Sequence, residues 1–415
     1  MKIAIIGSGI SGLTSAYLLN RQHDITLFEA GDWVGGHTHT VDVQVDGRDY
    51  AIDTGFIVFN DWTYPHFIKL LDQLGVASQP TEMSFSVHDP ASGCEYNGNN
   101  LNSLFAQRGN LLSPAFWGML RDILRFNREA LDDLEQQRIA STTTLGDYLR
   151  MGHYGTRFID HYIVPMGAAI WSMSLQDMLA FPLQFFVRFF KNHGLLSVSN
   201  RPQWRVVSGG SRSYVAPLSA SFSQRIRLNC PVQRVERDAE GVTVYSSAGS
   251  ERFDKVVFAC HSDDALAMLA APTVSEREIL GALRYADNDV VLHTDTRLLP
   301  DRRLAWASWN YRLGGARHQP AAVTYDMNIL QGIASDTTFC VSLNQSAAID
   351  PARILGRYTY RHPQYSLAGI DAQARWGDIN GQQHSYFCGA YWANGFHEDG
   401  VVSALRVADA FGERL

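Results

Sequence analysis

Three glycines near the start of the chain, Gly7, Gly9 and Gly12, have the spacing GxGxxG within the segment GSGISG, which also contains Ser11. At this spacing the first glycine permits a tight turn, the second lets the backbone approach a diphosphate, and the third lets a helix pack closely against a strand. The diphosphate would lie at the N-terminus of that helix, where unpaired N–H groups and the helix dipole favour negative charge. These residues therefore predict a binding site for a dinucleotide.

The glycine pattern is specific only where a strand precedes it and a helix follows it. The residues before Gly7, KIAII, form a short apolar run typical of a buried parallel strand, and residues 11–22 read as a helix. A second strand, DITLF, leads into Glu29, which stands 17 residues after Gly12 and is placed to accept hydrogen bonds from a ribose hydroxyl. The sequence therefore predicts a Rossmann-type βαβ unit over residues 2–29.

The composition limits the classes of partner and location. A length of 415 residues exceeds one ordinary core and predicts two or three domains. A formal net charge of −7 gives no general field for nucleic acid, so we expect no such partner. The five cysteines form no CxxC pair and no zinc-type cluster, so we expect no metal site and a cytoplasmic location. The sequence has no uncharged stretch of 18 residues that could span a membrane.

Changes of pattern along the chain divide it into two alternating domains. Residues from about 101 to 196 are helical in pattern and rich in aromatic residues, and short strand-like runs follow between about 285 and 345. We predict an α/β fold in which a discontinuous Rossmann-type dinucleotide-binding domain carries an inserted α+β substrate domain. The predicted dinucleotide-binding domain, to which the resemblance described next assigns FAD, comprises residues 1–80, 205–283 and 380–415, and the substrate domain comprises residues 81–204 and 284–379.

The region after Glu29 carries a family resemblance. A second glycine pair, Gly35-Gly36, is followed by a hairpin that turns at Asp46-Gly47 and by Asp53-Thr54-Gly55-Phe56. These features resemble the flavin-containing amine oxidoreductase superfamily, which includes amine oxidases, protoporphyrinogen oxidase, phytoene desaturases and flavin-dependent fatty-acid isomerases. That family places a GG(R)xxT segment and a downstream DxG against the flavin and the diphosphate. The resemblance implies FAD as the cofactor and assigns to its binding Gly35, Gly36, His37, Thr38 and Gly55.

Later segments extend the resemblance over most of the chain. CPVQRV at 230–235 is similar to the family's strand whose backbone meets adenine, which implies a role for Val232. Residues 165–182 and 206–215 resemble the substrate-domain helix and the return into the FAD domain. The final GFHEDGVVSAL resembles a turn whose N–H groups reach the flavin pyrimidine edge, which implies roles for Asp399, Gly400 and Val401.

Two positions depart from the family pattern. The arginine usual after the glycine pair is His37, and the acidic residue usual in the C-terminal FxGD/E segment is Ala390, which follows the matched Gly389. A ribityl or phosphate contact must therefore come from elsewhere in the chain. The pattern GAYWANGFHEDG especially resembles a subgroup of NAD/FAD-binding proteins encoded beside cyclopropane-fatty-acyl synthases.

The lysines bear on which flavin chemistry to expect. Amine oxidases of the superfamily carry a lysine near flavin N5 on a strand of the second domain, but residues 256–415 contain no lysine. We therefore expect hydride transfer to FAD from a hydrophobic, fatty-acyl or isoprenoid-like substrate, which is oxidised or desaturated. Amine oxidation is the main alternative, with Tyr391 and Trp392 as partial candidates for an aromatic cage. Double-bond isomerisation and non-catalytic flavin binding are further alternatives.

No second GxGxxG follows a strand, so we expect electrons to leave to oxygen, a quinone or another carrier. The sequence singles out no proton-transfer residue. Histidine titrates near neutral pH and five histidines could act as acid or base, although a structural role or simple exposure explains each of them more simply. These histidines are His37, His39, His261, His293 and His397. The matched loops place His397 and His37 near the flavin, and Trp392 is a third candidate.

The segment FPLQFFVRFF, residues 181–190, contains five phenylalanines. Aromatic residues at helical spacing usually face a core, so packing within the helical domain is the simpler interpretation. The alternative is a channel mouth or a peripheral contact with the inner face of the membrane, made by phenylalanines with Arg188 and Lys191 at the headgroups. Both forms of the alternative favour a lipid-like substrate.

Overall fold

The computed structural model describes residues 1–314 and 317–415. One half of the molecule is built on a five-stranded sheet in the order β10-β2-β1-β14-β20, in which every neighbouring pair is parallel. These strands are β10 (Ile226–Arg227), β2 (Asp24–Phe28), β1 (Lys2–Ile6), β14 (Lys255–Phe258) and β20 (Ser385–Phe387). The α/β class and the βαβ unit are thereby confirmed.

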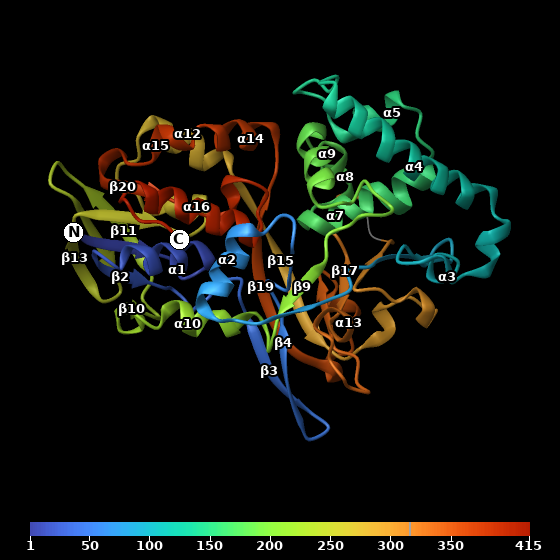
Figure 1. Ribbon diagram of the computed structural model, residues 1–415, viewed down its shortest axis with the longest axis horizontal. Helices are drawn as coiled ribbons and strands as arrows, with labels where there is room; N and C mark the ends of the chain where they lie inside the picture. Colours follow the sequence, from blue (N-terminus) through green and yellow to red (C-terminus); the bar gives the residue numbers. More distant parts are fainter. Residues whose placement is uncertain (315–316) are drawn as a thin grey trace.

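Helix α1 (Ile10–Leu19) follows β1, as the glycine pattern predicts. It packs against α16 (His397–Asp409), and Figure 1 shows both helices on the face of the parallel sheet. A Cβ on Gly12 would lie 1.9 Å from the Gly7 carbonyl oxygen, so only glycine lets the helix approach the strand this closely. Residues from both ends of the chain therefore build this half.

The second half is built on a seven-stranded sheet in the order β19-β15-β18-β17-β16-β7-β8. Its strands are β7 (Phe85–Asp89), β8 (Cys94–Asn97), β15 (Arg284–His293), β16 (Trp309–Arg312), β17 (Val323–Asp326), β18 (Cys340–Leu343) and β19 (Ile354–Gln364). The four strand-like runs expected between 285 and 345 are confirmed as β15 to β18. Strands β7, β8 and β19 were not predicted from the sequence. Strand β19 lies at the edge, where Pro363 is tolerated because proline has no N–H to donate.

Helices cover one end of the second sheet (Figure 1). They are α3 (Leu101–Leu104), α4 (Pro114–Glu135), α5 (Leu145–Met151), α6 (Thr156–Phe158), α7 (Val164–Trp171), α8 (Leu175–Leu179) and α9 (Leu183–Asn192). Phe181, Phe186, Phe189 and Phe190 are buried in their core, and only Phe185 of the five is partly exposed. The structure thus favours the packing interpretation of residues 181–190. Within the described ranges, no helix is both long enough and apolar enough for a bilayer span.

Smaller sheets complete the fold. The hairpin β3 (Thr40–Val45) and β4 (Arg48–Asp53) turns at Asp46 and Gly47, both with positive φ, as predicted. The remaining strands are β5 (Val58–Asn60), β6 (Ser78–Pro80), β9 (Trp204–Val207), β11 (Val232–Arg237), β12 (Val242–Ser246) and β13 (Gly249–Phe253). The remaining helices are α2 (Pro65–Leu74), α10 (Val215–Ser219), α11 (Ser262–Met268), α12 (Val274–Ala282), α13 (Met327–Gln331), α14 (Leu367–Ala374) and α15 (Trp376–Ile379). The domain boundaries given above stay a prediction, although each large sheet takes its strands mainly from the segments assigned to its domain.

Candidate cofactor and substrate site

The glycine turn leaves open space where a diphosphate is expected. Gly7 has a φ of +104°, and Gly9 stands at the N-cap of α1. A Cβ on Gly9 would meet no heavy atom within 4 Å, whereas one on Gly36 would lie 3.1 Å from the Gly9 Cα. The two glycine segments predicted from the sequence therefore face each other at Gly9 and Gly36, where no side chain would block an anion.

Glu29 lies at the end of β2 beside this turn. Its carboxylate accepts hydrogen bonds from the Ser8 N–H at 2.9 Å, the Ser8 hydroxyl at 2.6 Å and the Gly31 N–H at 2.8 Å. A carboxylate offers about four lone-pair sites, so capacity remains for a ribose hydroxyl. The hydrogen bonds fix the carboxylate at the position that sequence analysis assigned to ribose binding.

The Gly35–Gly55 region folds back on the glycine turn. The Gly35 N–H donates to the Ser8 hydroxyl at 3.2 Å, and the Phe56 N–H donates to the His37 carbonyl at 2.7 Å. A Cβ on Gly55 would lie 2.1 Å from that carbonyl oxygen, so glycine is required there for close packing. The predicted GG and DxG segments are therefore in contact, as the family resemblance implies.

The buried Asp53 connects this region to the segment returning from the helical domain. Its carboxylate accepts from the Ser211 N–H at 2.9 Å, the Ser211 hydroxyl at 2.9 Å and the Thr40 hydroxyl at 2.5 Å. Burial raises the pKa of Asp53 to about 6, although these donors favour its charged form. Asp53 thus has a positioning role that the family match at Gly55 did not assign.

The C-terminal residues reach the same turn. The Ser11 hydroxyl donates to the Gly400 carbonyl at 3.0 Å, and a Cβ on Gly400 would lie 2.7 Å from Ile10 Cγ2. The Gly389 N–H donates to the Ser403 hydroxyl at 2.9 Å. Val401 is buried in the core under α1, whereas Val232 is partly exposed at the start of β11. The cofactor roles of Ser11, Val232, Gly389, Gly400 and Val401 stay predictions.

His397 lies in the core beneath the site. Its Nε2 is 2.8 Å from the Tyr214 hydroxyl and 3.1 Å from the Thr38 hydroxyl, and its ring stacks on Phe56 at 3.5 Å. Burial holds the pKa of His397 well below its usual range, so the imidazole is neutral. Trp392 is also buried in a core, with its ring 5.2 Å from the Tyr391 ring and no hydrogen-bond partner for its Nε1 among the described residues. Packing explains the position of both catalytic candidates.

A cluster of histidines and tyrosines joins the two halves of the molecule next to the second glycine pair. The His37 ring is 5.4 Å from the Tyr360 ring, 5.6 Å from the His362 ring and 5.9 Å from the His261 ring. The histidine–tyrosine cluster comprises His37, His39, His261, Tyr358, Tyr360 and His362. Burial lowers the pKa of His37, and it lowers those of His261 and His362 to about 3, so these imidazoles are neutral.

Three members of this cluster, His37, His39 and His261, were predicted candidates, whereas the strand that completes the cluster was not predicted. Tyr358, Tyr360 and His362 alternate along β19, and such alternation places side chains on one face of a strand. This alternation with a period of two was the signal in the sequence that could have predicted the strand. His293, which was also singled out, lies outside the cluster and is 2.8 Å from the Ser342 hydroxyl through its Nε2.

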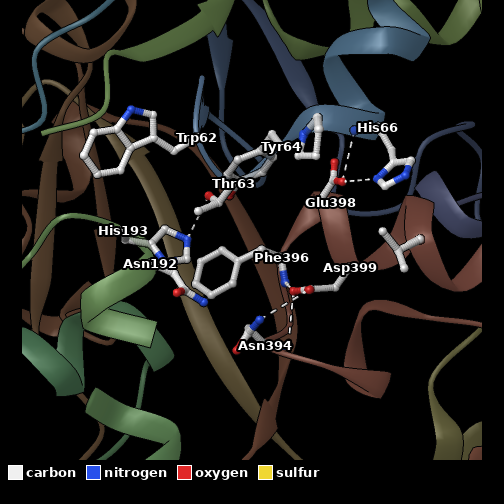
Figure 2. A pocket seen from close by; sticks show the side chains of 12 residues that line it. Trp62, Thr63, Tyr64, His66, Asn192, His193, Asn394, Phe396, Glu398 and Asp399 are labelled. Atoms are coloured by element: carbon white, nitrogen blue, oxygen red, sulfur yellow. Dashed lines mark hydrogen bonds and ion pairs between the residues drawn. The ribbon is translucent and has the colours of Figure 1, made fainter. Parts of the chain in front are cut away.

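A pocket of about 420 Å³ opens where α2, α9 and α16 converge (Figure 2). Thr63 and Trp62 precede α2, His193 follows α9, and Phe396 precedes α16. His193 Nε2 is 3.2 Å from the Thr63 hydroxyl, and burial lowers the pKa of His193 to about 4. The pocket therefore lies between α2 and α16 on one side and α9 on the other, and the His193 imidazole in its wall is neutral.

Two adjacent carboxylates of α16 line this pocket, and both accept hydrogen bonds from backbone N–H groups. Glu398 accepts from the His66 N–H at 3.0 Å and the Phe67 N–H at 2.8 Å, as Figure 2 shows in part. Asp399 accepts from the Phe396 N–H at 2.9 Å and the Asn394 N–H at 3.2 Å. Asp399 was predicted to contact the flavin; its visible role is to hold the loop before α16, and the cofactor role stays a prediction.

Asp399 gives a test of the electrostatics of this loop. Burial raises its pKa from 3.8 to about 7, so the folded state binds this proton more tightly than the unfolded state. The resulting stability is fully present below pH 3.8 and is lost as pH rises through about 7. Asp399→Asn keeps an oxygen for the Phe396 N–H but cannot titrate. Urea unfolding at a series of pH values should show that the variant gains stability relative to wild type as pH rises from 3.8 to about 7. If the free energies of unfolding of the two proteins change in parallel with pH, the raised pKa of Asp399 is contradicted.

The site fits FAD by its own chemistry. It offers a side-chain-free cradle at Gly9 and Gly36, a helix N-terminus for a diphosphate and the Glu29 carboxylate for a ribose. His37 Nε2 is buried without a hydrogen-bond partner among the residues described, which leaves a polar atom free beside the cradle. The glycines, the helix N-terminus and Glu29 were predicted from the sequence, whereas the unpartnered His37 Nε2 was not, and the contacts of all these residues with FAD stay a prediction.

Comparison with known proteins agrees with this geometry. A family model described as flavin containing amine oxidoreductase matches residues 10–311. A Mycobacterium tuberculosis protein named as a flavin-containing monoamine oxidase, AofH, is 27% identical over 270 residues, which cover 62% of this chain and 56% of that protein. The chain thus spans little more than half the length of this curated relative.

Two solved structures share the fold. Putrescine oxidase with bound putrescine has a TM-score of 0.71 at 16% identity, and the match covers 99% of each chain. A fatty acid isomerase from P. acnes, described as producing CLA, has a TM-score of 0.66 at 15% identity, with 99% of this chain and 97% of that chain covered. Because the family match spans residues 10–311, well over half of the chain, this chain belongs to the flavin-containing amine oxidoreductase family, whose members bind FAD.

Proposed function

We propose that this chain is an FAD-dependent oxidoreductase that oxidises or desaturates a hydrophobic, fatty-acyl or isoprenoid-like substrate by hydride transfer. The observation that carries the proposal is the position of the four lysines, each bonded outside the histidine–tyrosine cluster. Lys2 pairs with Glu251, Lys69 donates to the Leu415 carbonyl, Lys191 pairs with Glu135, and Lys255 contacts His384. None is free to act beside a flavin as the lysine of an amine oxidase does.

An aromatic region next to the pocket supports a hydrophobic substrate. The Phe396 ring, which lines the pocket, stacks on the Phe189 ring with 5.1 Å between ring centres. The centre of the Phe189 ring is 4.8 Å from that of the Trp171 ring. Tyr365 continues the region at 6.5 Å from Trp171. A substrate that enters the pocket would therefore meet aromatic carbon, which favours burial of an aliphatic chain.

Two polar atoms in the aromatic region lack partners. Trp171 Nε1 and the Tyr365 hydroxyl are buried without a hydrogen bond to any described residue. An indole N–H can only donate, so it suits an acceptor such as an acyl carbonyl. An ammonium group also only donates and would leave the indole N–H unsatisfied. This region therefore fits an acyl substrate better than an amine.

The reaction divides between cofactor and protein. When bound, FAD supplies the hydride acceptor. The chain holds the substrate and excludes water through its aromatic region, and the cluster contributes no positive charge because its histidines are neutral. Desaturation also releases a proton, and the unpartnered His37 Nε2 is the atom we assign to exchange it.

Amine oxidation is the second candidate, because Glu398 and Asp399 line the pocket. A carboxylate there would attract a substrate ammonium. However, Glu398 is bonded to the N-terminus of α2 and Asp399 to the loop before α16. The pKa of Asp399, raised to about 7 by burial, also weakens its charge at neutral pH. Neither carboxylate is free for an amine.

Anaerobic addition of substrate to the flavin-loaded protein distinguishes these functions. We expect an oleoyl ester or an isoprenoid alcohol to bleach the flavin's visible absorbance without turnover, whereas putrescine leaves the spectrum unchanged. Re-oxidation by oxygen or a quinone would then identify the electron acceptor. Product formation without lasting bleaching would indicate isomerisation instead. Bleaching by putrescine would overturn the proposal in favour of amine oxidation.

A further inference from the structure

Exposed apolar side chains gather where the helical half begins. Leu112, at the end of a short 3-10 helix, is 88% exposed, Leu124 is 57% exposed and Trp117 is 50% exposed. Leu101 and Leu111 are exposed in the same stretch. Figure 1 shows α3 and the start of α4 at the edge of the molecule opposite α1. These residues lie outside the cofactor site.

Helical spacing places basic residues among the apolar ones. Trp117, Arg121, Leu124 and Arg128 follow one another at intervals of three or four on the exposed face of α4. Arg121 has no ion-pair partner among the described residues, and the adjacent Asp122 points inward to the Gly155 N–H at 2.9 Å. The α4 surface, as we call it, comprises Leu111, Leu112, Trp117, Arg121, Leu124 and Arg128. Arg128 pairs with Glu129 at 3.8 Å, so Arg121 supplies the unpaired positive charge of this apolar surface, in a chain whose net charge is −7.

The aromatic side chain of the α4 surface is held in place. The Trp117 Nε1 donates to the Leu111 carbonyl at 2.9 Å, and its ring lies 5.5 Å from the Phe105 ring. Ser113 caps the start of α4 by accepting from the Phe116 N–H. The surface is therefore preorganised, which lowers the entropic cost of binding.

We propose that the α4 surface binds the face of a bilayer that contains anionic phospholipid. Leucine and tryptophan side chains enter the headgroup and acyl boundary, while arginines remain among the phosphates. A second copy of the chain or an acidic protein would also cover apolar residues. Mixing of unpaired arginine with protruding leucine on one helix face matches the layered chemistry of a bilayer better than either. The inference goes beyond the redox reaction and does not depend on it.

Flotation with vesicles tests this surface. We expect the flavin-loaded protein to float with vesicles of phosphatidylglycerol and phosphatidylcholine, and to float less with phosphatidylcholine alone or at high salt. Leu112→Glu should weaken binding at least about tenfold, since one buried leucine contributes on that order. Arg121→Glu should remove the preference for anionic lipid. Val274→Glu, at an exposed apolar residue of α12, is the matched control and should bind as wild type does.

The outcomes decide the proposal. The flavin spectrum and the unfolding temperature of each variant show whether it has folded. Loss of the cofactor changes the spectrum, whereas loss of membrane binding changes only flotation, so the two failures can be distinguished. Wild-type protein that fails to float, or Leu112→Glu that floats as wild type does, would overturn the proposal. A dimer in solution that Leu112→Glu dissociates, without vesicle binding, would assign the surface to a second copy instead.

Discussion

Gly9→Asp is expected to purify without colour while keeping its fold. A Cβ at this position meets nothing within 4 Å, so the backbone has room for the new side chain. The added carboxylate would lie against the diphosphate. Two charges about 4 Å apart near a protein surface repel by about 4 kcal/mol, which corresponds to roughly a thousandfold loss of affinity. The ratio of flavin to protein absorbance after purification measures the loss.

A second glycine provides the control for this substitution. Gly377 in α15 is exposed, and its Cβ would also meet nothing within 4 Å. Gly377→Asp adds the same charge away from the cofactor and should keep full flavin loading. The far-ultraviolet circular dichroism spectra of both variants should match that of wild-type protein from which the flavin has been removed. A yellow, fully loaded Gly9→Asp variant would show that the diphosphate lies elsewhere.

Glu398→Ala is expected to lower the free energy of unfolding by roughly 2–4 kcal/mol. The residue that precedes helix α2 is Tyr64, and its side chain accepts no hydrogen bond from the N–H groups of the first turn. The Glu398 carboxylate from α16 replaces that cap by accepting from the His66 and Phe67 N–H groups. Alanine would leave both donors without their partner, and the Phe67 N–H is buried. Urea unfolding monitored by circular dichroism measures the loss.

A conservative variant and a surface variant check this interpretation. Glu398→Gln keeps one acceptor oxygen and should lose less stability than the alanine variant. Glu135→Ala removes an exposed ion pair with Lys191, and exposed pairs contribute little, so its stability should change by less than about 1 kcal/mol. Equal losses in the glutamine and alanine variants would mean that charge, rather than hydrogen bonding, accounts for the stabilisation.

Elements whose signals are local were predictable from the sequence. The βαβ unit follows from Gly7, Gly9 and Gly12 between an apolar run and a helical pattern, and the β3–β4 turn follows from Asp46-Gly47. Strand β19 was missed because charged residues and Pro363 interrupt its apolar pattern. Its stability comes from pairing with β15 along its length, which is a tertiary property that a single segment does not reveal.

The site shows the same division. The glycines of the first turn and Glu29 were predictable because they belong to one short motif with a fixed spacing between a strand, a helix and a second strand. The positions of His397 and His362 were not, because they depend on packing between distant segments: Tyr214 and Phe56 hold the His397 ring, and β19 brings His362 to His37. A family match locates loops near a cofactor but does not decide which side chain of a loop turns into the core.

The parallel sheet is assembled from both ends of the chain, since β1 and β2 open it and β20 closes it through β14. During synthesis the first strands would leave the ribosome long before Ser385–Phe387 and α16 exist. A nascent chain would therefore hold the glycine turn for hundreds of residues without its Ser11–Gly400 contact. We therefore expect FAD to bind only late in synthesis. Stalled or truncated chains would lack the cofactor and would remain bound by chaperones.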